Sequence, residues 1–253
     1  MPADERDCAA GEPAAEVMKM RTGLAVFLLL AAAGQAEPGR VVDLKAADGT
    51  ALKASYYAAG KPGSGVLLLH QVNRDRKSWD VLATRLAAAG IHTLALDLRG
   101  YGESGGARAE ARKHAAEDID AAWQVLAGQP GVNGDAIGLG GAGYLGVDAA
   151  VMAAQRHGAA AKSLVLLSGQ AVIPGRQFMA QATQLPGLFV VADADEYPPT
   201  EEVMEWLYGL SRNPGSRFIH YVGPKAPWNG YETLPNCRHP ARTAPICFRR
   251  IPS

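Results

Sequence analysis

Short apolar segments alternate with helix-like segments along most of this chain. The stretches GVLLLH (65–70), IHTLALDL (91–98) and SLVLLSG (163–169) are continuous apolar runs, whereas 78–89 and 109–126 carry apolar residues at helical spacing. Continuous apolar strands are typical of parallel sheets, because helices cover both of their faces. The alternation therefore predicts the α/β class, with a doubly wound, mostly parallel sheet and helices on both faces.

The remaining segments extend the same pattern. Residues 41–57 predict a hairpin that turns at Asp48-Gly49 and adds an antiparallel edge to the sheet. Further strands are expected at 136–141, 185–193 and 217–223, and further helices at 144–155 and 200–210. Sites in open parallel sheets lie at the carboxyl ends of the strands, so the loops that follow each strand hold the candidate residues.

The composition fits one globular domain. The 253 residues are 48% hydrophobic, and the 25 basic side chains balance the 25 acidic ones. This balance gives no electrostatic reason to expect a nucleic acid as partner. The cysteines show no zinc-binding pattern, and we expect neither a metal nor another cofactor.

The start of the chain has the pattern of a secretory signal peptide. Lys19 and Arg21 precede the apolar run 23–33, and the small residue Ala36 offers a cleavage site. The run is well short of the ~20 residues that span a bilayer, so we expect no stable membrane insertion after cleavage. The mature protein is expected to be secreted or periplasmic.

Three regions follow from this interpretation. They are an N-terminal extension with the signal peptide (1–36), an α/β domain (37–235) and an irregular tail (236–253). A signal peptide should begin a chain, so Met18 or Met20 is the expected initiator.

The tail is rich in proline and arginine and lacks a helical stripe, a composition that suits a frameshifted or degraded end. Its cysteines, Cys237 and Cys247, would be free to pair after export, but the sequence does not decide whether they do.

A glycine-rich turn lies between the segments 136–141 and 144–155. Gly138, Gly140 and Gly143 have the spacing G-x-G-x-x-G of a dinucleotide site. Such a site normally follows the first strand and is followed about 20 residues later by an acidic residue. Here several strands come first, and the next strand, LVLLSGQ, has no acidic residue. The pattern therefore argues against a nucleotide site.

Several stretches, in order, resemble the α/β-hydrolase family of esterases and dienelactone hydrolases. They are LLLHQ (67–71), DLRGYGESGG (97–106), the glycine turn and VVADADEYP (190–198), and the resemblance covers about residues 65–222. It implies an α/β-hydrolase fold and a Ser–His–Asp mechanism acting on a small ester or acyl substrate.

The resemblance places Gly143 where the family has its nucleophilic serine. The closing glycine of that motif is also displaced, from the position of Leu145 to Gly146. The oxyanion donors are backbone groups, and the resemblance assigns them to the N–H of Tyr144 and to the loop at His70-Gln71, where the family usually has His-Gly.

The same resemblance suggests the other members of the triad. Asp195 fits the acid position, and His239 is the candidate base, since Asn229 holds another possible register and cannot act as a base. Ser168 and Ser104 are alternative hydroxyls, but neither lies on the elbow turn.

Three functions remain open on this basis. The chain is an exported hydrolase relative that is inactive or weakly active because Gly143 replaces the nucleophile, a non-catalytic relative that binds a ligand or a protein, or an ester hydrolase with an unrecognised nucleophile. A decaying gene would look the same as the second of these.

Overall fold

The computed structural model describes residues 39–192, 195 and 200–222. The chain divides into two compact units, Met1–Ala33 and Gly34–Ser253, and every described residue belongs to the second. The expected signal peptide and the tail 236–253 lie outside the described residues.

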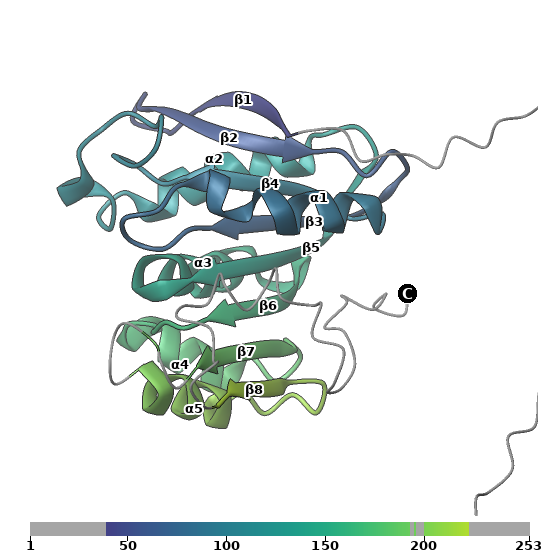
Figure 1. Ribbon diagram of the computed structural model, residues 1–253. Helices are drawn as coiled ribbons and strands as arrows, with labels where there is room; N and C mark the ends of the chain where they lie inside the picture. The colour runs from purple at the N-terminus through teal and green to yellow at the C-terminus, as the bar shows by residue number, and fades with distance from the viewer. Residues whose placement is uncertain (1–38, 193–194, 196–199, 223–253) are drawn as a thin grey trace, which may run out of the picture. The chain divides into compact units, whose positions relative to one another are not determined.

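The strands form one sheet in the order β1-β2-β4-β3-β5-β6-β7-β8 (Figure 1). Only the pairs β1–β2 and β2–β4 are antiparallel, and all other neighbours are parallel. The strands are β1 (Arg40–Lys45), β2 (Ala51–Tyr57), β3 (Gly63–Leu69), β4 (His92–Asp97), β5 (Val132–Ala142), β6 (Ala161–Leu167), β7 (Gly187–Ala192) and β8 (Arg217–Tyr221). The mostly parallel sheet with an antiparallel hairpin at its edge is thus confirmed.

Helices cover both faces of the sheet (Figure 1). Among the described residues, α1 lies on the face of the sheet whose buried side chains include Leu68, Val165 and Val190, while the other helices lie on the opposite face with Leu69 and Leu166. The helices are α1 (Asp80–Ala88), α2 (Ala115–Ala127), α3 (Gly143–His157), α4 (Ile173–Gln181) and α5 (Thr200–Leu210), with 3-10 turns at Arg76–Trp79, Arg108–Glu110 and Gly158–Ala160. The doubly wound arrangement expected from the sequence is confirmed.

Two helices differ from the sequence prediction. The helix expected from residue 109 begins only at Ala115, because the preceding segment is held to the glycine-rich loop: Arg108 donates to the Gly100 carbonyl at 3.1 Å and covers the Tyr101 ring. The second difference is α4, which the sequence analysis did not expect because Pro174 and Gly175 obscure its pattern.

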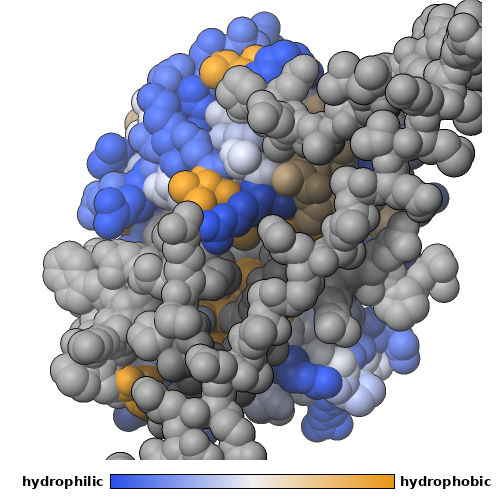
Figure 2. Space-filling model, turned by 45° about the vertical axis from the view of Figure 1, so that its right-hand side comes forward, coloured by the Kyte–Doolittle hydropathy of each residue, from blue (hydrophilic) through white to orange (hydrophobic). Residues whose placement is uncertain are grey.

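The surface offers no broad apolar patch in the part of the chain that the structure describes. The large exposed apolar side chains lie on different elements, and on the face that Figure 2 shows, the visible hydrophobic areas of the described residues lie among hydrophilic ones. Such scattered exposure is normal for a globular surface. No helix among the described residues is long and apolar enough to cross a membrane.

The carboxylate of Asp97 organises the loops at the carboxyl ends of β3 and β4. It accepts the backbone N–H of Arg76 at 2.7 Å and that of Glu103 at 2.8 Å, and it pairs with the Arg76 guanidinium. Both side chains of the pair are almost fully buried. Gly102 has a φ of +53°, and a Cβ there would overlap the Asp97 carboxylate, so glycine is required.

Arg99 forms a second clamp in the same loop. Its guanidinium donates to Asp118 on α2 at 2.6 Å and to Asp48 in the β1–β2 turn at 2.6 Å. Hydrogen bonds to Arg99 hold the pKa of Asp48 well below its usual range. The residues that make DLRGYGESGG recognisable therefore build the loop rather than carry out chemistry.

Removing Arg76 should destabilise the fold strongly. Arg76→Met leaves the buried Asp97 carboxylate without its charged partner, which costs about 3–5 kcal/mol in comparable buried pairs. Urea denaturation of the purified protein measures the loss. The matched control is Arg156→Met, whose pair with Asp120 is much more exposed and should contribute less than about 1 kcal/mol. Equal effects of the two variants would contradict the role given to Asp97.

Candidate functional site

Gly143 lies on a sharp turn between a strand and a helix, as the sequence predicts. β5 ends at Ala142, α3 begins at Gly143, and Gly143 has a φ of +63°. A residue with a side chain is strained at such a φ, by about 1–3 kcal/mol. The backbone therefore has the form of a nucleophile elbow, while the residue at its centre has no side chain to act as nucleophile.

The displaced glycine of the motif has a packing role. A Cβ on Gly146 would overlap the Leu69 carbonyl oxygen and lie 2.9 Å from that of His70, and a Cβ on Gly141 would overlap the Gly146 carbonyl. The first turn of α3 thus sits directly against the end of β3. Gly146 permits the close approach even though it comes one residue later than in the resembling family.

Gln71 packs where a side chain of residue 143 would stand. A Cβ built on Gly143 would lie 2.6 Å from Cγ and 2.9 Å from Cβ of Gln71, closer than real side chains approach. Gln71 itself is buried. The two departures from the family pattern, glutamine after His70 and glycine at the elbow, are therefore in contact with one another.

His70 is a positioning residue for this loop. Its side chain is fully buried, Nδ1 donates to the Gln71 carbonyl at 2.9 Å, and Nε2 accepts from the Leu98 N–H at 3.0 Å. Burial lowers the pKa of His70, which favours the neutral ring that these partners require. Since both ring nitrogens are engaged, His70 ties the Gln71 loop to the end of β4 and does not act as a base.

The N-terminus of α3 has no side-chain cap. Ala142 at the N-cap supplies no hydrogen-bonding side chain, and the first turn contains no acidic residue. The Tyr144 side chain contacts Arg112, which precedes α2. The Arg112 guanidinium lies 4.8 Å from the centre of the Tyr144 ring and donates to the Tyr144 hydroxyl. The part of Tyr144 that fits the oxyanion role is therefore its backbone N–H, at the positive end of the helix.

The acid and base candidates are not brought together by the described residues. Asp195 follows β7, is partly buried, and donates its backbone N–H to Ala192 at 3.2 Å. The residues on either side of Asp195 lie outside the described residues, and so does His239. The pairing of Asp195 with His239 stays a prediction.

The two alternative serines differ sharply. Ser104 donates to the Asp97 carbonyl at 2.6 Å and accepts the Lys53 N–H at 2.9 Å, so its hydroxyl belongs to the loop structure. Ser168 has a φ of +44°, is buried, and its Oγ has no hydrogen-bond partner among the described residues. A strained φ costs about 1–3 kcal/mol and a buried unpaired hydroxyl about the same. The sequence offers Ser168 as an alternative hydroxyl, but no sequence pattern predicts its positive φ or its unpaired Oγ.

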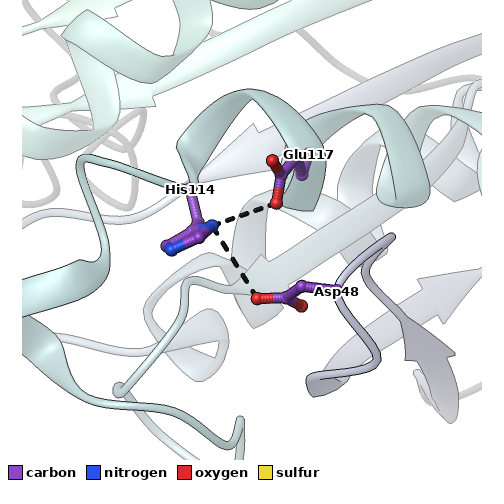
Figure 3. A group of neighbouring side chains, drawn as sticks. All are labelled: Asp48, His114 and Glu117. Atoms are coloured by element: carbon purple, nitrogen blue, oxygen red, sulfur yellow. Dashed lines mark hydrogen bonds and ion pairs between the residues drawn. The ribbon is translucent and has the colours of Figure 1, made fainter.

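One group of side chains has the composition of a metal site. Asp48, His114 and Glu117 meet between the β1–β2 turn and α2 (Figure 3), with His114 Nδ1 3.0 Å from Glu117 Oε2 and 3.7 Å from Asp48 Oδ2. Arg99 already pairs with Asp48. A cation held there would face this guanidinium, so we interpret the group as an ion-pair cluster that joins the turn to the helix.

Comparisons with known proteins agree with this geometry. Residues 60–194 match the family model described as serine aminopeptidase, S33, whereas a search of curated proteins gave no match.

Solved structures with the same fold include DcsB in complex with its substrate analogue, with 16% identity, a TM-score of 0.64, and coverage of 77% of this chain and 92% of that one. The dienelactone hydrolase-like promiscuous phosphotriesterase P91 from metagenomic libraries has 17% identity and a TM-score of 0.58 over 78% of this chain and 93% of its own. The Pyrococcus furiosus esterase Pf2001 has 17% identity and a TM-score of 0.59 over 78% and 84%. At these identities the likeness shows the fold.

Restoring a serine at the elbow should destabilise the protein through Gln71. Gly143→Ser adds a Cβ at positive φ and against Gln71, so we expect a loss of about 1–3 kcal/mol in unfolding free energy. In a Gln71→Gly background the contact is gone, and the same change should cost less. A double-mutant cycle by urea denaturation measures the coupling, expected to be at least about 0.5 kcal/mol. Additive effects would contradict the contact between the two positions.

Proposed function

We propose, from the premise that this chain belongs to the serine aminopeptidase S33 family of α/β hydrolases, that it is an exported relative without Ser–His–Asp catalysis. In this proposal it keeps the elbow and oxyanion loop of its relatives and binds a small ester- or acyl-type ligand without cleaving it efficiently. The function thus follows from the site and not from the fold, since one fold carries many activities.

The observation that carries the proposal is the contact between Gln71 and Gly143. Glycine at the elbow removes the attacking oxygen, and the Gln71 side chain occupies the space from which that oxygen would act. Nucleophilic catalysis needs an activated hydroxyl, thiol, amine, imidazole or carboxylate, and neither Gly143 nor the buried carboxamide of Gln71 supplies one.

The ligand class follows from what the site retains. The uncapped N-terminus of α3 favours an oxygen atom that carries partial or full negative charge. Carbonyl oxygens of esters and carboxylate oxygens of acids are such groups. The esterase and dienelactone hydrolase-like names of the structural neighbours point to the same chemistry in those proteins.

The activity test uses a fluorophosphonate probe and p-nitrophenyl acetate. Because Gly143 cannot be acylated, the purified protein should not be labelled and should hydrolyse the ester no faster than an Asp195→Ala variant. A Ser168→Ala variant serves as the control for the other hydroxyl near the elbow. Stoichiometric labelling of any serine, or a rate that depends on Asp195, would overturn the proposal and favour an active hydrolase with a different nucleophile.

Export is the second part of the proposal. The basic residues Lys19 and Arg21 before a short apolar run support cleavage after Ala36. When the full gene is expressed in a bacterial host with its own secretion machinery, the mature protein should begin at Glu37 and lie outside the cytoplasm. N-terminal sequencing of the fractionated protein checks this. An exported form that retains residues 1–17 would contradict it.

A further inference from the structure

Ser168 combines a strained backbone with a buried, unpaired hydroxyl, and no described contact compensates for either. It has a positive φ of 44°, which glycine would adopt without strain, and only 6% of its surface is exposed. Its Oγ is buried and has no hydrogen-bond partner among the described residues. Both costs fall on one side chain, and residues that keep such costs are concentrated at functional sites.

The sheet places Ser168 beside the elbow. Leu167 pairs with Ala142 of β5 and with Val190 of β7, and the Ser168 N–H donates to the Val190 carbonyl at 2.9 Å. Ser168 is therefore the first residue beyond β6, next to Gly143, which is the first residue beyond β5. The turn touches the elbow directly, because a Cβ on Gly169 would overlap the Gly143 carbonyl oxygen.

The same strand order sets Ser168 between two other candidate groups. β6 lies between β5 and β7, so Ser168 stands between the elbow and the loop that carries Asp195. On the β5 side the N-terminus of α3 lacks a side-chain cap. An unpaired hydroxyl and an uncapped helix N-terminus thus occur together at the end of the sheet, and both are satisfied by an oxygen acceptor.

We infer that Ser168 is a ligand-binding residue that donates its hydroxyl hydrogen to the carboxylate of a small aliphatic acid held at the N-terminus of α3. The inference rests on the proposed function, since a ligand that is not cleaved needs a fixed polar contact in place of a nucleophile. A carboxylate fits better than a neutral ester, because the helix N-terminus favours negative charge and the described site residues supply no competing anion at the first turn. No covalent step is involved.

Titration with sodium butyrate, followed by backbone amide NMR of the whole mature protein, tests the inference. Butyrate should shift the amide signals of Tyr144, Ser168 and Gly169 saturably, whereas butyramide, of the same shape but neutral, should bind at least about tenfold more weakly. Ser168→Ala removes the hydroxyl and should raise the Kd for butyrate about tenfold or more.

Ser168→Gly separates binding from structure. It removes both the hydroxyl and the backbone strain, so it should weaken butyrate binding as Ser168→Ala does while raising the melting temperature. Ser163→Ala, at the other end of β6, is the matched control and should bind butyrate like the wild type. A Kd within twofold of the wild type in both Ser168 variants, or equal binding of butyramide, would overturn the inference. Ester turnover is measured separately, so a failure of the proposed function is recognised by activity and not by these titrations.

Discussion

The buried pair of Asp97 and Arg76 fixes the loops from which the site is built. One carboxylate holds the backbone of the loop after β3 and the backbone of the glycine-rich loop after β4. His70 adds a second tie between the same loops through the Leu98 N–H. Because these polar groups are buried, each needs its partner, and the loop conformation is set closely. Gln71 therefore presents its side chain to the elbow from a rigid support.

In the proposed function, the site keeps the backbone form of a hydrolase elbow without its nucleophile. At Gly143 the backbone keeps the positive φ of an elbow, yet the strain that a serine would bear there is absent. Gln71 fills the space, so the oxyanion loop and the elbow remain packed together. The fold-determining glycines at Gly141 and Gly146 still allow the first turn of α3 to touch the sheet. The backbone form of the elbow is thus compatible with the close packing of Gln71 against Gly143.

Ser168, in contrast to Gly143, keeps two unfavourable features, a positive φ on a residue with a side chain and a buried hydroxyl that is unpaired among the described residues. A glycine there would relieve the backbone strain, and a hydrogen-bond partner would satisfy the hydroxyl, but position 168 is a serine and the described residues supply no partner. Natural proteins maintain such local costs where a site needs them. An elbow without backbone strain at Gly143, beside a strained Ser168, is what we expect of a site that binds a ligand without cleaving it.

The sequence by itself determined the fold class, the order of the strands along the chain, the antiparallel hairpin and the position of the elbow, because continuous apolar runs and glycine turns are local signals. It missed α4 and the late start of α2, where contacts with other elements decide the structure. Only the tertiary structure brought Gln71 onto Gly143 and set Ser168 beside them, since these residues come from three different strand ends. The sequence records each residue's identity, but contacts between strand ends depend on how the sheet orders its strands, and no local pattern encodes that order.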